Sequence, residues 1–166
     1  MSKVRFEAAS QQVLALVHRL SVEEPDFWHI PAPLMDRATF DSLPKRWFVG
    51  TDVASGKVLG YCALSAHDPI NRSGWIGIVV VRELRKAGVV VPLARAFADL
   101  CFNEIGVRTL MASSLEGSPM SILVEKIGGW RKVGVLEDAQ YIRGEWKNRV
   151  IHQSINPRER SQEPTS

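Results

Sequence analysis

The sequence has few cysteines, no long apolar run and only a slight excess of one charge. Its two cysteines, Cys62 and Cys101, both lie inside apolar segments, so we expect buried, reduced thiols rather than a disulfide or a pair of nucleophiles. No segment approaches the roughly 18 apolar residues that a membrane-spanning helix needs. The N-terminal residues also lack the apolar stretch of a signal peptide, and we therefore expect a cytoplasmic protein.

The formal net charge of +3 is too small to indicate nucleic-acid binding by itself. Metal-ligand spacing and Ser-His-Asp arrangements do not rise above chance either. The composition, 45% hydrophobic and 23% charged over 166 residues, is typical of a soluble globular domain with a substantial core. We expect one domain over residues 1–155 and a polar, disordered tail over 156–166.

The spacing of apolar residues predicts a mixed order of strands and helices. Strands are expected at 4–9, 46–52, 57–68, 75–81, 107–115, 131–138 and 145–155, and helices at 10–20, from about 34, from 90 to near 106, and at 118–129. Residues 139–144 are expected to form a loop between the last two strands. One right-handed helical crossover joins strand 75–81 to strand 107–115 as a parallel pair, which gives an α/β fold with a mixed sheet.

The turn between strand 75–81 and the next helix is basic. Over residues 82–95, the side chains of Arg82, Arg85, Lys86 and Arg95 against Glu83 give an excess of three positive charges, equal to that of the whole chain. Free backbone N–H groups and the positive end of a helix dipole favour an anion at such a place. Taken alone, the turn is equally compatible with a solvated basic loop.

Three segments carry more specific patterns, in a fixed order along the chain: "RKAGVV" at 85–90, "SPMSILVEKIGGW" at 118–130 and "GVLEDAQYIRGEWKNRVIHQS" at 134–154. In sequence, spacing and surrounding elements they resemble the GNAT superfamily of acyl-CoA-dependent N-acetyltransferases, and within it the RimJ/RimL type. The resemblance covers about residues 46–155.

The matches to this family are residue by residue. Arg85 and Gly88 fit the turn motif R/Q-x-x-G-x-G/A, and Val90 stands where glycine or alanine is usual. In the second segment Ser118 takes the place of an asparagine and Ser121 that of a serine. The third segment matches at Gly134, Gly144, Trp146 and Val150, and Asn148 replaces the usual aspartate.

The resemblance implies a mixed, mostly antiparallel sheet flanked by helices, with a splayed parallel pair of strands at the cofactor site. It also implies acetyl-CoA as the acyl donor, with no metal. The implied cofactor-binding residues are Ile78, Val79, Val80 and Val81 in the strand, Arg85, Lys86, Ala87, Gly88, Val89 and Val90 in the turn, and Ser118 and Ser121 in the following helix.

Acetyl transfer by direct attack needs a base for the amine proton and an acid for the departing thiolate. The strand 75–81 contains no acid or base, so the candidates come from neighbouring segments. We expect Glu116 to accept the proton, and Tyr141 or Ser121 to supply one to the thiolate. A solvated carboxylate and a half-buried aromatic ring remain the alternative interpretations of Glu116 and Tyr141.

The acceptor is expected to be a primary amine on a protein N-terminus, a lysine or a small molecule. Trp28, Tyr141 and Trp146 are candidates for its pocket, with His67 as a weaker candidate beside a plain turn at Asp68. Trp47 and Phe48 are expected in the core. Two other functions stay open: a GNAT-fold protein that binds CoA weakly and acts through protein contacts, and, less favoured, a small nucleic-acid-binding domain. A homodimer is also possible by resemblance.

Overall fold

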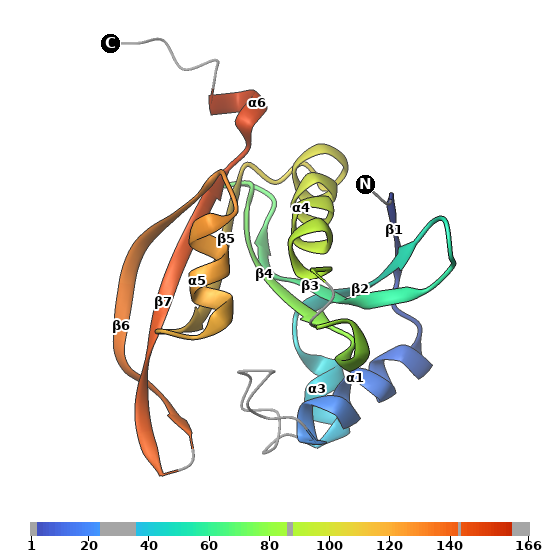
Figure 1. The fold of residues 1–166 in the computed structure, drawn as a ribbon, viewed down its shortest axis with the longest axis horizontal. Helices are drawn as coiled ribbons and strands as arrows, with labels where there is room; N and C mark the ends of the chain where they lie inside the picture. Colours follow the sequence, from blue (N-terminus) through green and yellow to red (C-terminus); the bar gives the residue numbers. More distant parts are fainter. Residues whose placement is uncertain (1–2, 24–35, 86–87, 143, 161–166) are drawn as a thin grey trace. The chain divides into compact units, whose positions relative to one another are not determined.

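The computed structural model describes residues 3–23, 36–85, 88–142 and 144–160. Within these residues seven strands form a sheet in the order β1-β2-β3-β4-β5-β7-β6 (Figure 1). The chain divides into two compact units: unit 1 comprises Met1–Ser65 and Gly77–Phe97, and unit 2 comprises Ala66–Ile76 and Ala98–Ser166. The expected mixed sheet with flanking helices is confirmed. The single domain over residues 1–155 stays a prediction.

The elements follow the expected order with shifted ends. They are β1 (Val4–Ala8), α1 (Gln11–Glu23), α3 (Arg37–Ser42), β2 (Lys45–Asp52), β3 (Val58–Asp68), β4 (Ser73–Val80), α4 (Val90–Leu100), β5 (Thr109–Leu115), α5 (Pro119–Lys126), β6 (Trp130–Ile142), β7 (Glu145–Ile155) and α6 (Pro157–Arg160). A 3-10 turn at Arg82–Leu84 precedes α4, and a π-helical turn at Cys101–Ile105 follows it. Among the described residues, no helix is both long enough and apolar enough to span a membrane.

The strands of unit 1 alternate their side chains between two faces. On one face Val17 of α1, Phe40 of α3 and Tyr61 of β3 form a buried cluster, against which Trp47 and other partly buried side chains pack. Successive residues of a strand point to opposite faces, which sends Trp47 towards this cluster and Phe48 to the other side. The expectation that these two aromatic residues belong to the core is confirmed.

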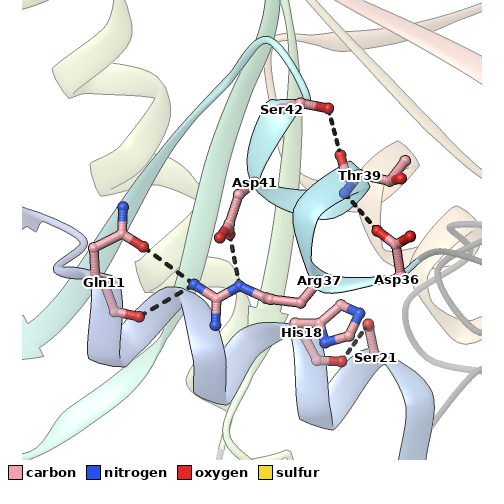
Figure 2. Close-up of polar contacts among 8 residues, drawn as sticks. All are labelled: Gln11, His18, Ser21, Asp36, Arg37, Thr39, Asp41 and Ser42. Atoms are coloured by element: carbon pink, nitrogen blue, oxygen red, sulfur yellow. Dashed lines mark hydrogen bonds and ion pairs between the residues drawn. The ribbon is translucent and has the colours of Figure 1, made fainter.

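A polar network joins α1 to α3, which lie side by side (Figure 2). The Asp36 side chain caps α3 by accepting the Thr39 N–H at 2.7 Å. Arg37 donates from Nε to Asp41 Oδ1 at 2.7 Å and from its second terminal nitrogen to Gln11 Oε1 at 3.2 Å. A helix of six residues has little stability by itself, so these contacts and the burial of Phe40 hold α3 in place.

Helix α4 packs on the opposite face of the unit 1 strands. Leu93 and Phe97 are fully buried, and the Phe97 ring lies 5.4 Å from that of Phe6 and 5.5 Å from that of Phe48. Gly60 on β3 makes this close approach possible. A Cβ added there would lie 2.3 Å from the Val79 carbonyl oxygen and 2.8 Å from a Leu93 methyl carbon.

The last three strands of unit 2 are antiparallel neighbours. β5 pairs with β7 from Thr109↔Ile155 to Leu115↔Arg149, and β6 is the edge strand beyond β7. The expected loop at 139–144 is wrong: β6 continues through Tyr141 and Ile142, and Tyr141 pairs with Trp146. Both Cys62 and Cys101 are buried, reduced thiols, as expected.

The described part of the expected tail includes an ion pair with Arg72. Pro157–Arg160 forms α6, whose Glu159 accepts from two nitrogens of Arg72 at 2.6 and 3.2 Å. Arg72 also donates from Nε to the Gly106 carbonyl at 2.8 Å. Pro157–Arg160 thus contacts the β3–β4 turn through Glu159, and the disordered tail expected over 156–166 stays a prediction.

Candidate functional site

β4 and β5 run parallel, and their pairing is short. Ser73–Trp75 pair with Thr109–Met111, and beyond these residues no described residue of β4 pairs with one of β5. β4 nevertheless continues to Val80 and β5 to Leu115. The expected parallel pair is therefore present, and its ladder covers only the first three residues of each strand.

A 3-10 turn at Arg82–Leu84 follows β4, and α4 begins at Val90. Arg85 donates from Nε to the Val80 carbonyl oxygen at 3.2 Å, which ties the turn back to the strand. Gly88 has a φ of +68°, in the left-handed region that favours glycine, and no described atom lies within 4 Å of the position of an added Cβ. The predicted residues Lys86 and Ala87 lie outside the described residues.

Helix α5 begins as the sequence predicted. Ser118 is the N-cap, and its hydroxyl oxygen accepts the Ser121 N–H at 3.2 Å, with Pro119 at the first helical position. Ser118 therefore has a structural role in unit 2 besides the proposed contact with a cofactor. Ser121 is 4% exposed, so its hydroxyl is largely covered. The roles of both serines stay predictions.

Glu116 follows the last residue of β5 and is tied to β7. Its N–H donates to the Asn148 carbonyl oxygen at 3.0 Å, and its Oε2 accepts from Asn148 Nδ2 at 2.9 Å. Lys132 Nζ of β6 lies 3.9 Å from its other carboxylate oxygen. The Glu116 side chain is 44% exposed. The carboxylate is thus held in one orientation and remains accessible, as a group that exchanges protons with a substrate must be.

A second polar group of unit 2 surrounds Arg149 on β7. Its guanidinium donates to the Ser113 hydroxyl at 2.7 Å, to the Ser113 carbonyl at 3.2 Å and to Gln140 Oε1 at 2.6 Å. Burial lowers the pKa of Arg149 from its usual value, because a low-polarity surrounding disfavours the charged form. These contacts connect β5, β7 and β6 next to the residues that hold Glu116.

Tyr141 and Trp146 form a pair at the turn end of the β6–β7 hairpin. Their ring centroids are 5.2 Å apart, and each residue is 61% exposed. They are accessible to a ligand, and their roles as acid and acceptor contact stay predictions. Trp28, the third aromatic candidate, lies outside the described residues.

The end of β3 contains His67 and Asp68. Asp68 Oδ1 accepts the N–H groups of Ile70 at 2.8 Å and Asn71 at 2.9 Å, which builds the turn into β4. These hydrogen bonds, first that from the Asn71 backbone, lower the pKa of Asp68. The Asp68 carboxylate has a local structural use, and the role of His67 stays a prediction. Among the described residues, no group of three or more His, Cys, Asp or Glu side chains is placed to hold a metal ion.

The sequence did not point to Lys132, Asp138 or Arg149. Arg149 is not distinguished in the sequence, since β7 also contains Glu145, Lys147 and Asn148. Lys132 and Asp138 lie on a strand with many exposed polar residues, where neither is distinguished from its neighbours. Their contacts depend on the register of β6 against β7.

The fold defined by this strand order, the β4–β5 parallel pair and the crossover helix is that of the GNAT N-acetyltransferases. The spermidine N-acetyltransferase SpeG from Vibrio cholerae, in complex with CoA and spermine, superposes with a TM-score of 0.79 over 92% of this chain and 95% of that chain, at 18% identity. A chimera of the Vibrio cholerae SpeG and hSSAT gives a TM-score of 0.80 over 97% and 100% of the chains, at 16% identity.

A third structure of Vibrio cholerae SpeG, in complex with manganese ions, has a TM-score of 0.75 over 96% of each chain at 15% identity. No protein-family model matches the sequence, and no curated protein matches it significantly. The expected GNAT fold is confirmed by these likenesses. The RimJ/RimL type stays a prediction.

Proposed function

We propose that this protein is a cytoplasmic, acetyl-CoA-dependent N-acetyltransferase of the RimJ/RimL type that acts on a primary amine. The observation that carries the proposal is the parallel β4–β5 pair, whose pairing ends at Trp75 and Met111 while both strands continue. Unpaired backbone groups on a strand edge bind an extended ligand as a further strand would. The pantetheine arm of coenzyme A has the amide groups for such contacts.

The cofactor is bound by backbone groups of Ile78–Val81 and of the turn at 85–90. The left-handed Gly88 and the open space beside it support this assignment, because a phosphate needs backbone N–H groups that side chains do not cover. The basic residues of the turn favour the charged pyrophosphate. Ser118 and Ser121, at the start of α5, contribute further contacts.

The chemistry is a direct acyl transfer. The amine nitrogen attacks the thioester carbon, the carbon–sulfur bond breaks, and an amide and the CoA thiol form. Glu116 takes the proton that the amine loses, and Tyr141 gives a proton to the thiolate, after which water restores both groups. Asn148 and Lys132 hold the Glu116 carboxylate for this step.

The acceptor class is a primary amine on a small molecule or a protein. The presence of spermine in a structure with the same fold supports polyamines as the first acceptors to test. The exposed rings of Tyr141 and Trp146 also suit a cationic amine, since aromatic faces attract cations. Homodimer formation, which the GNAT resemblance suggests, is tested by light scattering.

The test has two stages. Acetyl-CoA should raise the unfolding temperature of the purified protein, and CoA thiol should then be released in the presence of a polyamine, a lysine peptide or a peptide with a free N-terminus. The Glu116→Gln variant should bind acetyl-CoA normally and release thiol at least about 100-fold more slowly.

Val90, Ser118 and Asn148 differ from the residues usual in the family, so a protein that binds acetyl-CoA without catalysing transfer is the alternative function to test. Stabilisation by acetyl-CoA without thiol release from any amine would favour a CoA-binding protein that acts through protein contacts. No stabilisation at millimolar acetyl-CoA would contradict the proposal.

A further inference from the structure

Asn148 contacts Glu116 in two ways, one through its backbone, which continues the β5–β7 ladder, and one through its side chain. Its carbonyl oxygen accepts the Glu116 N–H at 3.0 Å, and its side-chain Nδ2 donates to Glu116 Oε2 at 2.9 Å. Its Oδ1 accepts the backbone N–H of Asp138 at 3.1 Å. One side-chain amide therefore joins the carboxylate after β5 to the backbone of β6.

An irregular stretch of β6 makes these contacts possible. β6 pairs with β7 at Leu136↔Arg149 and again at Gln140↔Lys147, so residues 137–139 stand opposite the single residue Asn148. Asp138 adopts a φ of +45° within this stretch. Its N–H would lack a strand partner, and the Asn148 side chain supplies one, as bulged backbone requires.

The contact with Asp138 fixes which end of the amide faces Glu116. A backbone N–H is a donor only, so the amide must direct its oxygen to Asp138 and its NH2 group to Glu116. The carboxylate therefore meets a donor, and Lys132 adds a positive charge 3.9 Å from its other oxygen. The Asn148 amide and the Lys132 ammonium thus each face one oxygen of the Glu116 carboxylate and hold it in one orientation.

We infer that Asn148 is a positioning residue that orients the Glu116 carboxylate by presenting a hydrogen-bond donor to it. The inference rests on the proposed role of Glu116 as the proton acceptor. The inference also explains why an asparagine suits this position. An aspartate could still accept the Asp138 N–H, but its second oxygen would place another carboxylate next to that of Glu116.

The test is the variant Asn148→Asp, whose side chain has nearly the same shape. The variant replaces the NH2 group that donates to Glu116 with an oxygen that can only accept when the aspartate is ionised. Two carboxylates at hydrogen-bonding distance do not both ionise readily, so Glu116 should keep its proton to higher pH. We expect the acidic limb of the kcat/KM profile to move up by about one pH unit or more. Gln153→Glu is the matched control, because it adds the same charge on β7 next to Arg131 and should leave the profile unchanged.

A readout that needs no turnover separates this inference from the proposed function. Carbon NMR of labelled glutamate should show Glu116 titrating at higher pH in Asn148→Asp than in the wild type, with Glu116→Gln used to assign the signal. An unchanged titration, in a variant whose melting temperature and circular dichroism are normal, would overturn the inference. A shifted titration in a protein that acetylates no amine would leave the Asn148–Glu116 contact established and refute the proposed function.

Kinetics in the absence of Glu116 complete the experiment. If Asn148 acts through Glu116, then Asn148→Asp should change neither the rate nor the pH profile when it is added to Glu116→Gln. If Asn148→Asp lowers the rate of Glu116→Gln by the same factor as it lowers the rate of the wild type, Asn148 has a structural or direct role. That result would also overturn the inference.

Discussion

Gly88 is the residue of the α4 turn whose backbone conformation depends most on its type. Its φ of +68° is costly for any residue with a Cβ, by about 1–2 kcal/mol. No described atom lies within 4 Å of an added Cβ, so Gly88→Ala should strain the backbone without a clash. We expect a modest loss of stability and a loss of acetyl-CoA affinity of about tenfold or more, measured by calorimetry.

Gly56 provides the control for this prediction. It lies in the β2–β3 turn with a φ of +69° and, like Gly88, has no described atom within 4 Å of an added Cβ. Gly56→Ala should therefore lower the melting temperature by a similar amount and leave acetyl-CoA binding unchanged. Equal losses of affinity in both variants would show that the Gly88 turn has no particular role in binding.

At the residue scale, the sequence predicted contacts that depend on local chain geometry. The helix expected at 118–129 does begin there, because Ser118 caps it and Pro119 follows, and a cap and its helix are set within a few residues. The partner of Glu116 was not predictable. Asn148 is 32 residues away, and the two meet only because β6 and β7 pair with an irregular register.

Gly60 allows the β4 backbone and the Leu93 side chain of α4 to lie close to β3. An added Cβ would lie 2.3 Å from a backbone oxygen of β4, and backbone cannot move aside as a flexible side chain can. We expect Gly60→Ala to lower the free energy of unfolding by about 1–3 kcal/mol, measured by urea denaturation.

Gly77→Ala on β4 is the comparison for this variant. Its added Cβ would lie 4.0 Å from the Ala63 side chain, an ordinary contact distance. It should therefore change the unfolding free energy by much less than Gly60→Ala. Similar losses in the two variants would mean that the glycines matter through strand propensity and not through the approach of α4.

At the scale of elements, the spacing of apolar residues predicted which segments are strands and which are helices. The prediction was wrong where polar residues continue the strand β6. Residues 139–144 were expected to form a loop between the strands at 131–138 and 145–155. β6 instead continues to Ile142, since pairing with β7 and the Tyr141–Trp146 contact extend the hairpin. Tertiary pairing of this kind leaves little trace in a single sequence.

At the scale of the whole molecule, we expect the stability of the fold at low pH to depend on three aspartates. Asp36 caps α3, and Asp52 and Asp68 are the last residues of β2 and β3. Hydrogen bonds lower the pKa of Asp36 through Thr39, of Asp52 through Ser55 and of Asp68 through Asn71, each from an ordinary 3.8. The folded state thus binds fewer protons than the unfolded state below this value. The stabilisation is complete above pH 3.8 and is lost as the pH falls further.

The melting temperature should therefore be level above this pH and fall below it. The triple variant Asp36→Asn, Asp52→Asn, Asp68→Asn should show a shallower fall, because asparagine keeps a hydrogen-bond acceptor at each turn without a charge to neutralise. Scanning calorimetry from pH 7 to pH 2.5 measures both curves. An equally steep fall in the triple variant would assign the acid sensitivity to other groups.

The ion pair between Arg72 and Glu159 also has a consequence for protein synthesis. Its two residues are 87 positions apart in the sequence. Likewise, β5 has no antiparallel partner until β7 has been synthesised. Every segment of unit 1, by contrast, has been synthesised once Phe97 is translated. Unit 1 can therefore form while unit 2 is still being made, and a nascent chain that stalls before Glu145 exposes β5 as an open edge for other chains to pair with.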